Sequence, residues 1–153
     1  MTAAMAVDIT TGRLAHQVVT VETRLPTPNT REHPMVRSKR VREQRRVVRH
    51  ALERLAVRPR LRPGQRLRVT LIRIGSPRCD TDRANISLAA VRDEVARWAF
   101  DVPFEAINAK GKRYAPRAPD GPNDRIDWLY GPHEKAPKGM RKYQAARIII
   151  EQP

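Results

Sequence analysis

The sequence RLRVTLIRI at residues 66–74 contains the clearest strand pattern in the chain, and it continues through GSP (75–77) into RCDTDR (78–83). Apolar and polar side chains alternate over residues 67–71, which predicts a strand with one buried face. The Gly75-Ser76-Pro77 turn ends that strand. Asp80 and Asp82 follow at once. The stretch therefore predicts two carboxylates at the end of a strand, just before a helix.

Asp80 and Asp82 form a candidate site for a divalent cation. In an extended backbone, side chains two residues apart share a face and are separated by roughly 6.6 Å along the chain. Carboxylates of this kind suit Mg²⁺, or Mn²⁺, which can activate water and stabilise charge on a phosphodiester. A third acid would come from Asp120, Asp124 or Asp127. The structural alternative is a turn in which Asp82 caps the following helix.

Further elements surround this stretch. Periodicity predicts strands over residues 17–23, 124–130 and 144–151, and helices over 36–55 and 85–100. The second helix carries an apolar stripe formed by Leu88, Val91, Val95 and Trp98. The predicted order β-α-β-α-β-β favours an α/β (α+β) fold in which one small mixed sheet is covered by two main helices.

The chain length of 153 residues fits one domain. Residues 1–16 are predicted to form a flexible N-terminal tail, and residues 17–153 a single domain. Residues 101–122 show no clear period and contain Lys110, Lys112 and Arg113. We expect this segment to be a basic loop insertion.

The formal net charge of +15 indicates a polyanionic partner. Residues 31–73 hold fifteen Lys or Arg and three acids, a local charge of 15 − 3 = +12. A solvated helix face would normally mix signs, so we expect contact with nucleic-acid backbone. No apolar run reaches the roughly 18 residues typical of a membrane span, and no membrane partner is expected. The candidate DNA-binding residues are Asn29, Arg31, Arg40, Arg42, Arg78, Arg83, Lys110, Lys112 and Arg113.

A few other residues allow two interpretations. The single cysteine, Cys79, fits a reducing cytoplasm and is expected to be a small buried residue, not a nucleophile. His33 is expected to be a loop histidine without a catalytic role. Trp98 and Trp128 are predicted to lie in the core. Tyr114 is equally consistent with base stacking and with an exposed loop position.

Several motifs in order resemble the RusA-type Holliday-junction resolvases, especially those of phages and prophages, over about residues 18–151. The motifs are Pro28-Asn29-Thr30-Arg31-Glu32-His33, Pro77-Arg78, Asp80-Thr81-Asp82, Leu88-Ala89-Ala90-Val91-Arg92-Asp93, Asp120-Gly121, Asp124-Arg125-Ile126-Asp127-Trp128-Leu129-Tyr130 and Ala146-Arg147-Ile148-Ile149-Ile150-Glu151. The resemblance implies a small mixed α/β fold, a homodimer, and Mg²⁺-dependent cleavage of four-way DNA junctions in recombination and repair.

By the same resemblance, Asp80, Asp82 and Asp120 would be the catalytic metal ligands, with Asp124 as an alternative third ligand. The chain differs from the family pattern at three places. Arg83 stands where the family usually has Asn, and Ile86 or Ala89 stands where it has Lys. Pro119 replaces one of a pair of acids before Asp120.

Three functions are therefore consistent with the sequence. The first is a junction endonuclease in the cytoplasm of a bacterial or phage-infected cell. The second is a non-catalytic basic DNA-binding protein with a resolvase-like fold and an altered active site. The third is a basic RNA-associated protein of ribosomal type. Charge is common to all three, so only the acids can distinguish them.

Overall fold

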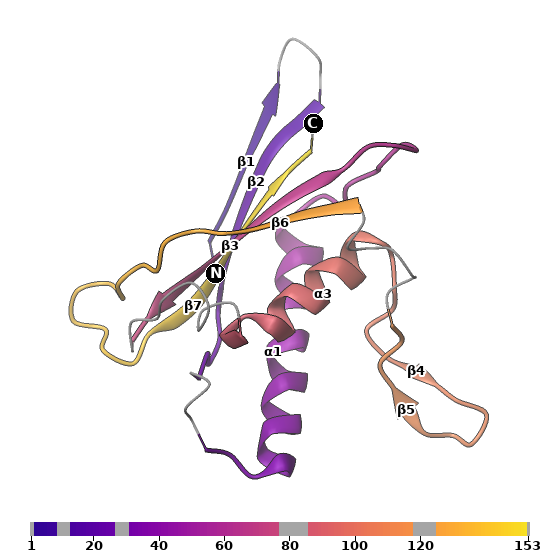
Figure 1. Ribbon diagram of the computed structural model, residues 1–153, viewed down its shortest axis with the longest axis vertical. Coiled ribbons are helices and arrows are strands. Elements are labelled where there is room, and N and C mark those ends of the chain that lie inside the picture. The colour runs from indigo at the N-terminus through magenta and orange to yellow at the C-terminus, as the bar shows by residue number, and fades with distance from the viewer. Residues whose placement is uncertain (1, 9–12, 27–30, 77–85, 118–124, 153) are drawn as a thin grey trace.

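The computed structural model describes residues 2–8, 13–26, 31–76, 86–117 and 125–152. It contains a five-stranded sheet in the order β1-β2-β7-β3-β6, two main helices and a small two-stranded sheet β4-β5 (Figure 1). The elements are β1 (Thr2–Asp8), β2 (Arg13–Glu22), α1 (Pro34–Leu55), β3 (Leu67–Gly75), α3 (Ala89–Ala99), β4 (Ala106–Ile107), β5 (Arg113–Tyr114), β6 (Ile126–Tyr130) and β7 (Gln144–Glu151). The predicted mixed α+β class is confirmed.

The sheet is centred on β7, which pairs antiparallel with β2 on one side and with β3 on the other. Ile148 of β7 lies between Val19 of β2 and Leu71 of β3. Strand β6 pairs with β3 in the parallel sense, and Leu67 lies opposite Ile126. A parallel pair needs a long crossover, which here contains α3 and the β4-β5 hairpin. The chain therefore enters β6 beside the start of β3, not beside its end.

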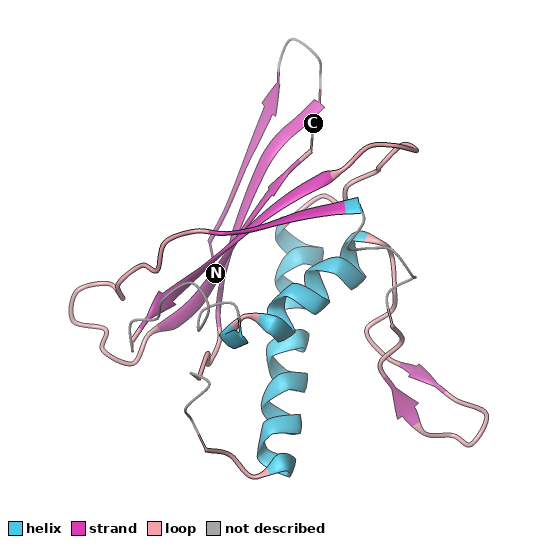
Figure 2. Cartoon of the chain, in the orientation of Figure 1, coloured by secondary structure: helices cyan, strands magenta, loops and turns pink. Residues whose placement is uncertain are grey.

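Both helices cover the same face of the sheet (Figure 2). The stripe predicted for the second helix is fully buried, with Leu88, Val91 and Val95 at 0% exposure and Trp98 at 1%. Trp98 is thus in the core, as predicted. Trp128 is partly buried at the edge of this core, and the Arg92 guanidinium lies 4.8 Å from its ring centroid. The core is formed mainly by Val19, Val21, Val48, Ala51, Leu52, Leu67, Val69, Leu71, Val91, Val95, Trp98, Ile126, Ala146, Ile148 and Ile150.

A smaller apolar cluster contains Ile72, Ile74 and Ala145. The loop over residues 131–143, between β6 and β7, approaches this cluster closely. A Cβ placed on Gly131 would lie 2.6 Å from the Ile72 side chain, so any larger residue here would require that side chain to shift. The loop also adds one parallel bridge to the end of β3, between Ile74 and Glu134. It is therefore packed against the end of β3.

The expectation of a flexible tail over residues 1–16 is wrong for the parts that form strands. β1 pairs antiparallel with β2 from Thr2↔Thr20 to Asp8↔Arg13, and β2 begins at Arg13, earlier than the predicted Gln17. Residues Thr2–Asp8 are rich in alanine, which has a weak strand propensity. Pairing with an exposed strand edge, which no local pattern reveals, determines their conformation.

The region predicted as a basic loop is also partly regular. β4 and β5 pair antiparallel, with Ala106 opposite Tyr114 and Ile107 opposite Arg113. The turn between them is closed by Asn108, whose side-chain oxygen accepts hydrogen bonds from the backbone N–H of Lys110 (2.9 Å) and Lys112 (3.0 Å). Strands of two residues are too short to show a period-2 pattern. The segment is thus a hairpin with a basic tip.

Candidate nucleic-acid interface

Arg73 in β3 connects the described residues on both sides of the segment that contains Asp80 and Asp82. Its side chain is 1% exposed, so this cation of the basic segment 31–73 does not face a polyanion. The guanidinium donates to the carbonyls of Gly75 (3.2 Å) and Leu25 (2.7 Å) and to the Ser87 hydroxyl (3.3 Å). Arg73 therefore fixes the chain just before residue 77 and again just after residue 85.

The candidate metal ligands Asp80, Asp82, Asp120 and Asp124 lie outside the described residues, whereas Asp127, the other acid considered as a third ligand, lies in β6 and is ion-paired with Arg66 across 2.8 Å. Asn29, Arg78, Cys79 and Arg83 also lie outside the described residues. Their predicted roles therefore stay predictions. Within the described ranges, no group of three or more His, Cys, Asp or Glu side chains is arranged to hold a metal ion.

The described residue next to Asp124, a candidate third metal ligand, shows where the chain enters β6. Arg125, directly after Asp124, donates to the Arg62 carbonyl (3.2 Å), and its guanidinium lies 5.7 Å from the Phe100 ring centroid. This contact is at the start of β6, whereas Ser76 is at the far end of β3. Nine residues of strand span about 26 Å. Arg125, which follows Asp124, therefore lies at the opposite end of β3 from Ser76, the last described residue before Asp80.

Two candidate DNA-binding arginines on α1 are engaged in ion pairs. Arg40 binds Glu32 through three hydrogen bonds of 2.8 to 3.1 Å, and the Glu32 side chain is only 6% exposed. The hydrogen bond from Arg40 lowers the pKa of Glu32. Arg42 donates to Glu105 across 2.7 Å, which lowers the pKa of Glu105 and raises that of Arg42. Both arginines are thus partly neutralised by a carboxylate and offer less net charge to a ligand.

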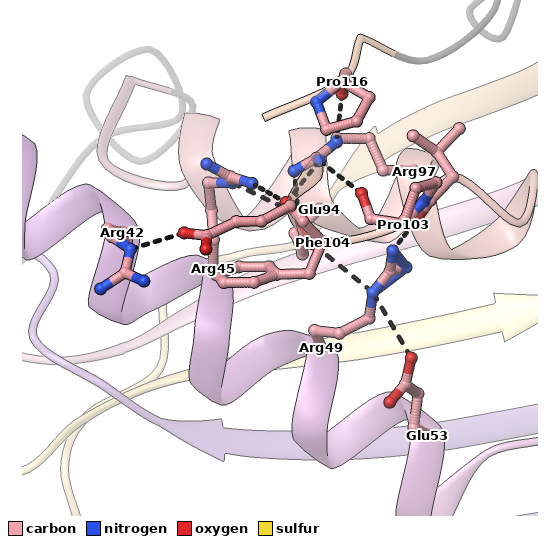
Figure 3. Close-up of polar contacts among 11 residues, drawn as sticks. Arg42, Arg45, Arg49, Glu53, Glu94, Arg97, Pro103, Phe104 and Pro116 are labelled. Carbon is pink, nitrogen blue, oxygen red and sulfur yellow. Dashed lines mark hydrogen bonds and ion pairs between the residues drawn. The ribbon is translucent and has the colours of Figure 1, made fainter. Parts of the chain in front are cut away.

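A fully buried carboxylate, Glu94 of α3, forms the centre of a larger network (Figure 3). Arg97 Nη1 donates to Glu94 Oε2 across 2.7 Å. Arg45 and Arg49 of α1 place their Nε atoms 3.3 and 3.6 Å from the same carboxylate. One buried negative charge is thus surrounded by three arginines from two helices. It links α1 to α3 by charge in addition to apolar packing.

The same arginines hold the base of the β4-β5 hairpin. Arg97 donates to the carbonyls of Pro103 and Phe104 on one side of the base and of Pro116 on the other, at 2.8 to 2.9 Å. Arg45 also donates to the Phe104 carbonyl (3.1 Å), and its guanidinium lies over the Phe104 ring. Arg49 donates to the Val102 carbonyl. The hairpin is therefore anchored firmly at its base.

The hairpin itself projects away from the sheet and helices (Figure 1). Lys110, Lys112 and Arg113 are exposed, and in the described part of the chain none of them is ion-paired with a carboxylate. Tyr114 is 47% exposed, which agrees with either of its two interpretations. Of the candidate DNA-binding residues that the structure describes, these three cations are available to a polyanion, and so is Arg31, which is exposed and has no ion pair with a carboxylate within the described ranges.

His33 has a structural position. It is the N-cap of α1, and its Nδ1 accepts a hydrogen bond from the Met35 backbone N–H (3.2 Å). This satisfies one of the free N–H groups at the start of the helix. The described geometry therefore accounts for His33 without a catalytic role.

Sequence reasoning missed Arg73 and Glu94, and it gave no role to the cations of the loop over residues 131–143. The four cations of that loop are Lys135, Lys138, Arg141 and Lys142. A lysine- and proline-rich loop between two strands was the only signal available for them.

Comparison with known proteins identifies no relative of this chain. No family model, curated protein or solved structure matches the chain. Neither main helix in the described ranges combines the length and the apolar character needed to cross a membrane. The chain is thus defined, by its own residues, as a small α+β domain with a strongly basic surface.

Proposed function

We propose that this chain is a metal-dependent, structure-selective endodeoxyribonuclease that resolves four-way DNA junctions by phosphodiester hydrolysis. The resemblance of its ordered motifs to the RusA-type resolvases supports the proposal. The observation that carries it is the position of Arg73, which fastens both flanks of the Asp80–Asp82 segment to the end of a central strand. A pair of carboxylates that must act together benefits from such a fixed frame.

The donor chemistry fits the implied cation. Asp80 and Asp82, with Asp120 or Asp124 as the third ligand, would present the oxygen donors that Mg²⁺ prefers, and Mn²⁺ accepts the same donors. Such an ion supplies activation of water and stabilisation of charge at the phosphodiester. The chain's own cations would hold the DNA backbone in reach. In the hydrolysis, a water oxygen bonds to phosphorus and one phosphorus–oxygen ester bond breaks.

The basic surface supports DNA as the substrate. Most described carboxylates are already bound to arginines, as in the pairs Arg46–Glu43 and Arg66–Asp127. The exposed cations of the hairpin are left for phosphate contacts, which release counterions and supply affinity without regard to sequence. We further propose that the enzyme acts as a homodimer, as the resemblance implies; its mass in solution, measured by light scattering, tests this.

A second function, a non-catalytic DNA-binding protein with a resolvase-like fold, is favoured by one observation. Ile86, one of the two positions where the family carries a lysine, is 62% exposed and apolar. An exposed isoleucine cannot stabilise phosphate charge as a lysine would. This alternative predicts tight binding of branched DNA without turnover.

The deciding experiment incubates the purified protein with a labelled four-way junction and a matched linear duplex, in Mg²⁺ and in EDTA, alongside Asp82→Asn. The nuclease predicts paired nicks in the junction that require Mg²⁺ and are lost in Asp82→Asn. Binding without nicks in either Mg²⁺ or Mn²⁺ would support the non-catalytic binder. Preference for RNA over junction DNA at matched salt would reject both.

A further inference from the structure

An open cavity of about 350 Å³ lies beside the end of β3. One wall is Ser76, the last described residue before the segment that contains Asp80 and Asp82. The other wall is the loop between β6 and β7, which runs beside the end of β3 in Figure 1. The lining residues are Ser76, Ala136, Pro137, Lys138, Gly139, Met140 and Arg141.

Hydrogen bonds of the backbone and of one side chain hold both walls of this cavity in place. Gly75 donates to the Glu134 carbonyl and Glu134 donates to the Arg73 carbonyl, each across 3.0 Å. The Gln144 side chain donates to the Ser76 carbonyl across 2.6 Å. Within the loop, Met140 donates to the Pro137 carbonyl across 3.0 Å, which closes a turn. The cavity is therefore a built feature and not a gap between unconnected loops.

The cavity is positively charged. Two of its lining residues, Lys138 and Arg141, are cations, and none is an acid. Residues 131–143 hold four cations and one acid, 4 − 1 = +3, and that acid, Glu134, is already ion-paired with Arg147. In the described chain neither Lys138 nor Arg141 is ion-paired with a carboxylate. Their side chains are exposed, so a ligand can reach both.

The chemistry of this lining selects an anion of phosphate type. A guanidinium offers a planar fork of donors to phosphate oxygens, and an ammonium offers a mobile point charge. The cavity is also close to the candidate acids along the chain. Asp80 follows Ser76 by four residues, so covalent reach keeps the two Cα atoms within about 14 Å of each other.

We propose that Lys138 and Arg141 form a phosphate-binding site for a nucleic-acid backbone, beside the phosphodiester presented to Asp80 and Asp82. Its place next to the reacting group rests on the proposed nuclease function. Phosphate binding itself needs no metal and no cleavage. The loop over residues 131–143 thus becomes a second basic contact, on the opposite side of the molecule from the β4-β5 hairpin (Figure 1).

The test is an NMR titration of the ¹⁵N-labelled full-length protein with the oligonucleotide dT4 in EDTA. The backbone amides of Ser76, Gly139 and Arg141 are expected to shift in a saturable manner. The double variant Lys138→Ala/Arg141→Ala is expected to weaken this binding by about tenfold or more. The matched control Lys135→Ala/Lys142→Ala removes the same charge from the same loop outside the cavity lining, and is expected to change binding by less than about twofold.

The remaining outcomes are also decisive. Unchanged amides around the cavity, or equal losses in the two double variants, would overturn the proposed site. Inorganic phosphate that reproduces the shifts and competes fully with dT4 at equal concentration would assign the site to free phosphate and overturn its assignment to nucleic acid. Absence of junction cleavage with intact dT4 binding at the cavity would reject only the nuclease. Junction cleavage with no cavity response would reject only this site.

Discussion

Arg97 Nη1 donates to Glu94 Oε2 across 2.7 Å within one turn of α3, and both side chains are almost entirely buried. Glu94 also receives Arg45 and Arg49 from α1, so a single carboxylate balances charges from two helices. A buried charge that loses its partner destabilises the fold strongly, even where the intact pair itself contributes little to stability. The stability of the helical layer and of the hairpin base therefore depends on Glu94.

Replacement Glu94→Gln is predicted to lower the free energy of unfolding by about 3–5 kcal/mol, because three arginines lose their buried counter-charge. Urea denaturation measures the change. The matched control is Glu53→Gln, since Glu53 lies 3.6 Å from Arg49 but is 54% exposed. The control is expected to cost less than about 1 kcal/mol. Equal effects of the two changes would mean that Glu94 does not organise the cluster.

The Arg42–Glu105 pair makes a pH-dependent contribution. The hydrogen bond from Arg42 holds the pKa of Glu105 below its ordinary value of 4.5. A carboxyl with a lowered folded-state pKa stabilises the fold above its unfolded-state pKa, and this stabilisation is lost as the pH falls through the folded-state pKa. Glu105→Gln is therefore expected to lower Tm at about pH 6, and the difference from wild type should shrink as the pH falls below the ordinary value of 4.5. A difference independent of pH would contradict this assignment.

Much of the fold is predictable because its longer elements carry complete apolar periods. The strand predicted over residues 144–151 matches β7, and the helices over 36–55 and 85–100 correspond to α1 and α3. Val91, Val95 and Trp98 recur at helical spacing and are buried as expected. Periodicity works here because one face of each element packs on the same core.

The rest depends on contacts between residues far apart in the sequence. Glu94 and Arg45 are 49 residues apart, and neither helix contains a pattern that marks these charged residues as buried. Arg73 is likewise buried, and its hydrogen bonds go to Leu25 and Ser87 from two other segments of the chain. The candidate acids Asp80 and Asp82 were proposed from local spacing and resemblance, and they stay predictions because they lie outside the described residues.

Replacement of Gly75, where β3 meets the loop over residues 131–143, is expected to destabilise the fold. Its φ is +116°, and an added Cβ would lie 2.2 Å from the Tyr143 carbonyl oxygen. Gly75→Ala therefore combines backbone strain of about 1–3 kcal/mol with a clash against a neighbouring backbone. Gly111→Ala provides a control, since Gly111 has a φ of +75° but open space around it. Thermal denaturation should show the larger loss for Gly75→Ala; equal losses would show that the close approach costs nothing.

The hairpin cations are predicted to contact DNA phosphates. The triple variant Lys110→Ala/Lys112→Ala/Arg113→Ala should reduce the slope of log affinity against log salt by up to about 2.7, since each phosphate contact contributes about 0.9. The matched triple Arg46→Ala/Arg66→Ala/Arg68→Ala removes the same formal charge from arginines that lie within 4.0 Å of a carboxylate. Fluorescence anisotropy with a labelled junction gives both slopes. Equal slopes would show that net charge, not the hairpin, governs binding.

The most direct measurement of the central claim compares binding and cleavage of one four-way junction by the wild-type protein and by Asp80→Asn. Binding is measured by gel shift in EDTA, and cleavage on the same labelled junction after addition of Mg²⁺. We expect Asp80→Asn to bind at least as tightly, because a charge that repels phosphate is removed, and to cleave no DNA. A wild-type protein that binds the junction without cleaving it, or an Asp80→Asn variant that cleaves at the wild-type rate, would contradict the account.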